Sequence, residues 1–461
     1  MTGRRDFPRI DGVMLKGQKT SVDWPAIPSA ADAATLALLV QFEESEWWSE
    51  DKILDHQLRQ LGSLLSHFQH TCPYFKDRLD GDPRTLDLDA FRRIPILTRT
   101  DIQDAGDALL STAIPKNHGR LLSTSSSGST GRPINARKTD VNQTFHRALN
   151  LRNHLWHRHD LDAKFGTIRG YAPDYALAPN GKYLSSWTSV YKTGPSVVLN
   201  STRCTVGEQL HWIMKERPAY ILSYPHNFHA LALRCRETGI KMPWLKALLT
   251  FSEALSPGKR AIIEDTFGVL VEDMYSAAEV SMIALQCPEE PGHYHVQSEN
   301  VLVEVVDENG APCAPGKTGR LLVTDLHNFA MPFVRYEIGD LAIMGSACSC
   351  GRGLPVLKRI FGRVRNMLYL ANGEQVDPDI AALHLHEIAP LRQYQMIQKS
   401  YTDIDMKLVL TRPLSEEEAS RMRNLIITAL GQPFTLNLIP VDDIPRHPSG
   451  KFEDFMSEMG P

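Results

Sequence analysis

Residues 123–134 read STSSSGSTGRPI, a stretch of hydroxyl side chains and glycines that stops at a proline. A packed core has little use for so many hydroxyls, because each buried one needs a hydrogen-bond partner. A flexible linker has this composition, and so does an anion-binding loop in which glycines let backbone N–H groups converge. A nucleotide P-loop would need a Lys-Ser or Lys-Thr pair after its last glycine, whereas Arg132 and Pro133 follow Gly131. Composition alone favours a flexible connection, so the rest of the chain has to decide.

The length and composition bound the fold class and the partners. A chain of 461 residues is expected to form two or three domains, and its 42% apolar and 23% charged residues are ordinary for a globular protein. Its net charge of −4 gives no reason to expect nucleic acid as a partner. No secretory signal and no membrane-length apolar run is visible, so a cytoplasmic protein without a membrane partner is expected. An odd number of cysteines fits reduced thiols or metal ligation better than a disulfide framework.

Helix-like and strand-like segments alternate along the chain. Residues 30–70 carry apolar positions at helical spacing, and Thr98 or Thr100 and then Asp140 are expected to cap further helices. Short β-rich segments, which together predict a mixed α/β fold, lie at 219–224, 246–251, 269–275, 301–307 and 319–326. The character of the sequence changes near residue 362, where a smaller unit begins that contains an Asn-Gly turn. We therefore predict a large domain over 1–362 and a small one over 363–461.

Three further stretches can each be interpreted either as part of a nucleotide-binding site or as an ordinary structural element. In YSAAE, Tyr275 could stack on a base and Glu279 could hold Mg²⁺, or the stretch could begin a surface helix. In RYEIGD, Asp340 could accept ribose hydroxyls, or it could form an ordinary turn after glycine. In PSGK, Lys451 is an ordinary solvated tail lysine unless its loop folds over a site. Each of these signals is weak when taken alone.

The order of the motifs is far more specific than any one of them. SSGSTGRP, YSAAE, RYEIGD, GRVRN and PSGK follow one another over roughly residues 90–455, and in this order the chain resembles the adenylate-forming enzymes. It looks most like the phenylacetate–CoA ligase branch, which includes capsule-biosynthesis relatives; FSEAL and CSCGRGLP are branch-like features. The resemblance implies an α/β fold, with a large N-terminal adenylate-forming domain of mixed sheets and helices and a small, mobile C-terminal α+β domain.

The resemblance also implies a role for each motif residue. The loop around the β- and γ-phosphates of ATP would be formed by Ser126, Ser127, Gly128, Ser129, Thr130 and Gly131. The adenine would be bordered by Glu253, Ala254 and Tyr275, and the ribose would be held by Asp340 and Arg363. Glu279 would bind Mg²⁺, and Arg365 would lie at the interdomain hinge. Lys451 would bridge the substrate carboxylate and the α-phosphate during adenylation.

Three positions depart from the superfamily pattern. Ile134 stands where a lysine usually follows the loop proline, Ala278 stands where a threonine usually precedes the magnesium glutamate, and Arg365 stands where Asp or Lys is common. Attack of a carboxylate on the α-phosphorus crowds negative charges together, so Mg²⁺ on Glu279 and a positioned Lys451 would lower the barrier. The loss of the threonine hydroxyl puts catalytic efficiency in doubt, but the lysine is present.

A cluster of cysteines and histidines follows the pattern of a structural zinc site. Cys348 and Cys350 form a tight pair, and Cys287 stands upstream with His293 and His295 close behind. The alternative is a set of reduced loop cysteines, but CSCGRGLP is too polar and glycine-rich for apolar burial to explain two thiols. We predict that Cys287, His295, Cys348 and Cys350 bind zinc, and we favour His295 because it leads directly into a strand.

The expected activity is ATP-dependent activation of an aryl or other small carboxylic acid, followed by transfer of the acyl group to CoA. The expected activity and the predicted metal site imply four cofactors: ATP, Mg²⁺, CoA and a structural Zn²⁺. Transfer to an amine or to a carrier-protein thiol is the alternative, since no CoA-specific signature is visible. A third hypothesis is a protein that binds nucleotide without turnover, and only Ala278 supports it. The sequence does not decide whether the protein forms a homodimer.

Overall fold

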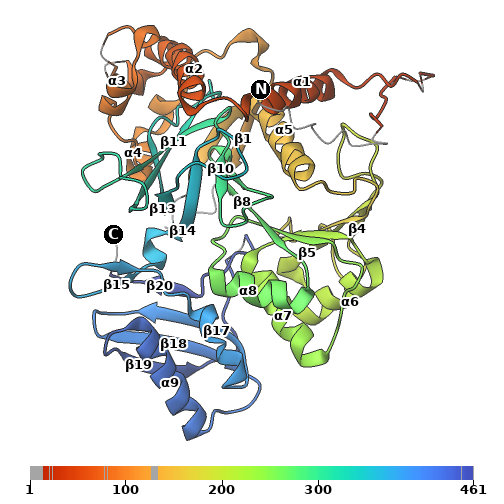
Figure 1. Cartoon of the computed structure of the whole chain (residues 1–461), viewed down its shortest axis with the longest axis vertical. Coiled ribbons are helices and arrows are strands. Elements are labelled where there is room, and N and C mark those ends of the chain that lie inside the picture. Colours follow the sequence, from red (N-terminus) through yellow and green to blue (C-terminus); the bar gives the residue numbers. More distant parts are fainter. Residues whose placement is uncertain are drawn as a thin grey trace. The chain divides into compact units, whose positions relative to one another are not determined.

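The computed structural model divides the chain into two compact units, which Figure 1 colours along the sequence. The first contains Met1–Asp162, Ser186–Thr193 and Met274–Ile360, and the second contains Ala163–Ser185, Gly194–Asp273 and Phe361–Pro461. The structure describes residues 14–19, 21–22, 24–76, 78–79, 81–125, 133–447 and 449–459. The predicted phosphate loop, residues 126–131, lies outside them. Within the described ranges, no helix has both the length and the apolar character needed to cross a membrane.

The helices of the first unit begin at polar caps. They are α1 (Ala30–Ser45), α2 (Glu50–Thr71), α3 (Leu88–Arg93), α4 (Arg99–Ala105) and α5 (Asp140–Trp156). Thr98 precedes α4 in a reciprocal capping box with Asp101, which confirms one of the two expected caps. The expectation for Asp140 is wrong, because Thr139 caps α5 and Asp140 is the first residue of the helix. A carboxylate in the first turn of a helix is nevertheless favourable, since it faces the positive end of the helix dipole.

Neighbouring strands form the sheet of the first unit. Their order across the sheet is β11 (Val301–Val306), β12 (Thr318–Asp325), β13 (Tyr336–Met344), β14 (Val356–Arg363), β10 (Tyr294–Val296), β9 (Ser281–Gln286) and β8 (Val271–Ala277). The strands predicted at 269–275, 301–307 and 319–326 are thereby confirmed. A separate antiparallel pair consists of β1 (Leu121–Ser125) and β2 (Asn135–Thr139), in which Ser125 pairs with Asn135.

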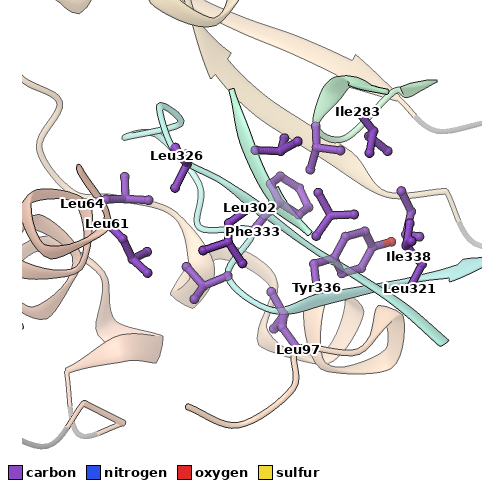
Figure 2. Packing of buried hydrophobic residues seen from close by; sticks show 14 of the residues in the cluster. Leu61, Leu64, Leu97, Ile283, Leu302, Leu321, Leu326, Phe333, Tyr336 and Ile338 are labelled. Carbon is purple, nitrogen blue, oxygen red and sulfur yellow. The ribbon is translucent and has the colours of Figure 1, made fainter. Parts of the chain in front are cut away.

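A large apolar core underlies this sheet (Figure 2). Leu61 and Leu64 of α2 contribute to it, together with Phe333 and Tyr336, whose rings meet edge to face with centroids 5.3 Å apart. Burying a side chain of this size contributes about 1.5–3 kcal/mol, so the cluster accounts for much of the stability of the unit. The core thereby fixes β13, the strand that carries Asp340.

The second unit contains a mostly parallel set of strands packed with helices. The strands are, in order, β7 (Ala247–Phe251), β6 (Tyr220–Ser223), β3 (Phe165–Arg169), β5 (Ser196–Asn200) and the antiparallel edge strand β4 (Lys182–Leu184). The helices are α6 (Val206–Glu216), α7 (Pro225–Thr238) and α8 (Pro257–Phe267), which bury Trp212 and Phe228 against the strands. Parallel strands end at the same edge of a sheet, so the residues after β3, β5, β6 and β7 are brought toward one another.

The C-terminal segment of the second unit is a small α+β region. Its sheet has the order β19 (Thr435–Pro440), β18 (Asp403–Leu410), β17 (Leu391–Gln398) and β20 (Phe455–Ser457), with α9 (Glu416–Leu430) packed against it. A short hairpin precedes it, formed by β15 (Leu368–Tyr369) and β16 (Gln375–Val376). The predicted Asn-Gly turn lies in this hairpin. Gly373 has φ +88°, a backbone conformation that favours glycine.

Candidate active site

The predicted site residues divide between the two units. Tyr275, Glu279 and Asp340 belong to the first unit, as do the four predicted zinc ligands. Glu253, Ala254, Arg363, Arg365 and Lys451 belong to the second.

Tyr275 and Asp340 lie side by side in the first unit. Tyr275 is on β8 and Asp340 is on β13. The Tyr275 hydroxyl donates a hydrogen bond to Asp340 Oδ2 at 2.5 Å, a short distance typical of an O–H group bonded to a carboxylate. The structure therefore brings two of the predicted nucleotide contacts together, and their roles toward base and ribose stay predictions.

Glu279 is a buried carboxylate that accepts no hydrogen bond from the residues that the structure describes. It lies in the turn between β8 and β9 and is 3% exposed. The cation paired with it is Arg99, whose Nη1 is 3.9 Å from Glu279 Oε1. Buried carboxylates normally accept hydrogen bonds, so these oxygens retain lone pairs for another ligand. They fit Mg²⁺, which is typically held by one or two carboxylates together with substrate phosphates.

Lys138 is a further candidate that is not among the residues predicted from the sequence. It lies on β2, and its Nζ donates a hydrogen bond to the Ala278 carbonyl at 2.7 Å. Burial lowers the pKa of Lys138, and the negative charges of Asp325 and Glu279 oppose that shift. A cation thus holds the backbone beside Glu279, at the residue where the usual hydroxyl is missing. The available signal was a lysine in the strand that follows the hydroxyl-rich loop.

The four predicted zinc ligands lie together and are buried. The ligand atoms of Cys287, His295, Cys348 and Cys350 all lie within 4.8 Å of one another. Cys348 Sγ is 3.8 Å from Cys287 Sγ, and Cys350 Sγ is 3.3 Å from His295 Nε2. Zinc–sulfur bonds of about 2.3 Å in a tetrahedron give sulfur–sulfur edges of about 3.8 Å, so the donor set and its spacing fit zinc.

The surroundings of the cysteine cluster support the same donor set. His295 Nδ1 lies 3.3 Å from the Leu354 carbonyl, which favours a proton on Nδ1 and leaves Nε2 to bind a metal. His293 also approaches the cluster, with Nδ1 3.3 Å from Cys348 Sγ, but it is not among the four mutually close ligands. The loop is anchored nearby, because Gly353 N–H donates to the Glu46 carbonyl at 2.8 Å.

Glu253 is held by two partners in the second unit. Both of its carboxylate oxygens lie 2.8 Å from His226 Nδ1, and Oε1 also accepts the backbone N–H of Phe452 at 2.9 Å. Burial alone would raise the pKa of Glu253, but the charge and hydrogen bond of His226 lower it overall. The carboxylate therefore stays ionised and ties the strand end after β7 to the tail that carries Lys451. Its role beside the adenine stays a prediction.

Ala254 and the start of the C-terminal segment are in close contact. A Cβ atom on Gly362 would lie 2.9 Å from Ala254 Cβ, and Gly362 has φ +78°, so glycine is required there on both counts. Arg363 follows at the end of β14. Arg365 is in the next turn, where its Nη2 lies 2.5 and 2.7 Å from the two carboxylate oxygens of Glu453. The predicted hinge residue is thus bound to the same tail as Lys451.

A second ion pair holds the tail beyond Lys451. Lys259 Nζ in α8 lies 2.8 Å from Asp454 Oδ1, and both side chains are largely buried. Burial alone would raise the pKa of Asp454, but Lys259 lowers it overall. A lowered pKa means that the pair stabilises the folded protein fully at neutral pH and loses this contribution as the pH falls through the folded pKa of Asp454.

Lys259→Met is expected to lower the free energy of unfolding by about 2 kcal/mol at pH 7, because Asp454 is left partly buried without its cation. The loss should shrink as the pH falls below the unfolded pKa of an aspartate, about 3.9. Denaturant unfolding as a function of pH measures both effects. The exposed Lys317 provides the control, and Lys317→Met should match wild type. Identical stability of the two variants at pH 7 would contradict the assignment.

The comparisons with known proteins agree with the motif order. The CapK C-terminal domain family matches residues 368–458. A phenylacetate-coenzyme A ligase from Thermus thermophilus is 27% identical over 448 residues, covering 88% of this chain and 97% of that protein. A phenylacetate-coenzyme A ligase from Escherichia coli is 24% identical over 436 residues, covering 86% of this chain and 93% of that protein.

A solved structure extends the agreement to the fold. The 2-hydroxyisobutyryl-CoA ligase in the postadenylation state, in complex with R3-HIB-AMP, has a TM-score of 0.71 at 18% identity, and it covers 90% of this chain and 92% of that one. At this identity the likeness shows the fold alone, so the expected α/β class is confirmed. With relatives that match over nearly their full length, the resemblance of this chain to the adenylate-forming superfamily and, within it, to the phenylacetate–CoA ligase-like branch of AMP-forming acid–CoA ligases is confirmed.

Proposed function

We propose that the protein activates a small or aryl carboxylic acid with ATP and then transfers the acyl group to CoA. The observation that carries this proposal is Glu279, a buried carboxylate without hydrogen-bond donors among the described residues and with Arg99 and Lys138 near it. Such a group suits a Mg²⁺ ion that accompanies a nucleotide. Relatives named as CoA ligases of phenylacetate and 2-hydroxyisobutyrate support the choice of a small acid and of CoA.

In the first step, an oxygen of the substrate carboxylate attacks the α-phosphorus of ATP. The bond from that phosphorus to the bridging oxygen breaks, and pyrophosphate leaves with the electron pair. Glu279 would hold Mg²⁺, which would neutralise phosphate charge when bound. Lys451 places a second cation at the reacting carboxylate and α-phosphate. Lys138 fixes the backbone that presents Glu279 and adds positive charge beside it.

In the second step, the sulfur of CoA attacks the acyl carbon of the adenylate. The bond between that carbon and the AMP oxygen breaks, AMP leaves, and the thiol proton passes to solvent. Lys451 is not needed for this chemistry and would obstruct the approach of the thiol. We therefore propose that the C-terminal domain, residues 363–461, rotates against residues 1–362 about a hinge at Arg365. The Arg365–Glu453 ion pair would couple that hinge to the tail.

We also propose that Cys287, His295, Cys348 and Cys350 bind one structural zinc ion. Three thiolates and an imidazole fill a tetrahedral site and leave no open position for a substrate. The zinc would pin the loop after β13 to the segment after β9 without taking part in the reaction.

Glu279→Gln is expected to reduce acyl-adenylate formation by about 100-fold and to raise the Mg²⁺ concentration needed for half-maximal rate, because an amide binds Mg²⁺ far less well than a carboxylate. ATP–pyrophosphate exchange titrated with Mg²⁺ measures both. Glu308→Gln in the exposed turn after β11 is the control and should behave as wild type. An unchanged Mg²⁺ dependence in Glu279→Gln would remove the observation on which the proposal rests.

The proposed activity itself is tested by ATP–pyrophosphate exchange with phenylacetate, benzoate, anthranilate and short branched acids. Exchange requires reversible formation of an acyl-adenylate and does not require an acceptor. We expect at least one acid to support it without CoA. Absence of exchange with every acid, in protein that binds ATP, would count against the enzyme and favour nucleotide binding without turnover.

A further inference from the structure

Tyr224 joins the catalytic tail to the loop that follows β3. It is the residue between β6 and α7 and is 5% exposed. Its hydroxyl accepts a hydrogen bond from the Gly170 N–H at 3.2 Å and donates one to the Ser449 carbonyl at 2.9 Å. One buried oxygen therefore connects the end of a parallel strand to the turn that carries Lys451.

Gly170 leaves no room for a side chain as long as the tail lies in this position. A Cβ atom at residue 170 would be 2.4 Å from Ser449 O, 2.9 Å from Ser449 C and 3.3 Å from Thr202 Cγ2. Gly170 is not among the glycines with positive φ, so its backbone conformation does not itself require glycine. The requirement comes chiefly from the close approach of the Ser449 backbone, since the third neighbour, the Thr202 methyl group, is more distant. An alanine here is expected to be harmless whenever the tail is elsewhere.

Backbone hydrogen bonds join Gly450 and Lys451 to His447, so displacement of Ser449 is expected to move Lys451 as well. Gly450 N–H donates to the His447 carbonyl at 2.7 Å, and His447 N–H donates to the Lys451 carbonyl at 3.0 Å. Gly450 has φ +86°, and a Cβ there would lie 3.2 Å from Tyr224 Cε2 and 3.3 Å from Ser201 Oγ. The turn thus packs against the residues that follow three strands, β3, β5 and β6.

We propose that Gly170 and Tyr224 are positioning residues that dock this turn and thereby place Lys451 for adenylation. The inference rests on the proposed function, because it assigns the docked tail to the first half-reaction. Neither residue needs to touch the substrate. Since transfer to CoA does not use Lys451, the two residues serve the first half-reaction and are dispensable for the second. A merely structural role would instead weaken both half-reactions and the fold.

The test separates the half-reactions in Gly170→Ala and Tyr224→Phe. Adenylation is followed by ATP–pyrophosphate exchange with the acid that serves wild type best, and thioester formation is followed from the synthetic adenylate of that acid with CoA. Gly170→Ala should lose about 100-fold in exchange, because a misplacement of about 1 Å has an effect of this size. Tyr224→Phe should lose about 10-fold, which corresponds to one hydrogen bond. Both should keep the wild-type Tm and a transfer rate within about threefold of wild type.

Gly207→Ala is the matched control. Gly207 lies in α6, where a Cβ would have only Thr205 Oγ1 nearby at 3.9 Å, so this variant should match wild type in both half-reactions. Normal wild-type exchange together with normal exchange by Gly170→Ala would overturn the inference while leaving the proposed function intact. If Gly170→Ala fails to fold, normal exchange by Tyr224→Phe overturns it. An equal loss of rate in both half-reactions of Tyr224→Phe also overturns the inference. A wild-type protein without exchange overturns the proposed function and this inference with it.

Discussion

Replacing Lys451 with alanine is expected to slow acyl-adenylate formation by about 10²–10³-fold or more, the loss typical of removing one preorganised contact to transition-state charge. The reaction brings a carboxylate onto a phosphate that is already negative, and no other cation of the tail is assigned to this junction. Lys451 lies in a turn where its carbonyl accepts a hydrogen bond from the His447 N–H at 3.0 Å. Transfer to CoA from a preformed adenylate should fall by less than about threefold.

A surface lysine of the same region serves as the control for that experiment. Lys399 forms an exposed ion pair with Glu458 at 2.5 Å, and Lys399→Ala should leave both half-reactions unchanged. The two rates are measured separately, with pyrophosphate exchange for adenylation and the synthetic adenylate for transfer. Equal loss of both rates in Lys451→Ala would show that the lysine acts through the fold instead of at the reacting groups.

Loss of the zinc ligands is expected to have the largest effect on stability. Purified wild-type protein should contain about one zinc ion per chain, and Cys348→Ser combined with Cys350→Ser should contain none. The expected cost is about 3 kcal/mol, or about 10 °C in Tm for a unit of this size, because metal binding contributes directly to the folding free energy. The loop would lose its attachment beside Glu46, where Gly353 now donates a hydrogen bond.

Metal analysis and thermal unfolding test this expectation. Cys313→Ser is the control, because Cys313 lies outside the metal cluster and should keep both the metal and the Tm. Zinc-free wild-type protein, prepared without chelator and with a normal Tm, would rule the site out. Wild-type metal content in the double variant would place the zinc elsewhere.

Most of the local structure could be predicted because it depends on local patterns. β-rich segments become strands, and Asn372-Gly373 forms its turn, since alternation and turn chemistry act over a few residues. The cap of α5 lies one residue before the predicted one, because Thr139 and Asp140 are both good caps and the sequence does not rank them. The proximity of Cys287, His295, Cys348 and Cys350 could be predicted because soft donors in two short groups limit the possible pairings.

The contacts that hold the tail could not be predicted in the same way. Gly170, Tyr224 and Ser449 lie far apart in the sequence, and their contacts depend on parallel strands that end at one edge. Lys138 has an ordinary place in a strand, and only the fold brings its amino group to the Ala278 carbonyl. Polar contacts between distant segments leave no periodic signal, whereas burial in a core does.

We propose that this chain makes an acyl-adenylate and passes its acyl group to CoA. The most direct measurement is the stoichiometry of AMP, pyrophosphate and acyl-CoA formed from ATP, Mg²⁺ and the best acid of the panel, with and without CoA. We predict equal amounts of all three products with CoA, and without it no more than about one equivalent of pyrophosphate per enzyme in a burst. Sustained turnover without CoA, or AMP release with CoA but no thioester, would show that the chain is not an acid–CoA ligase.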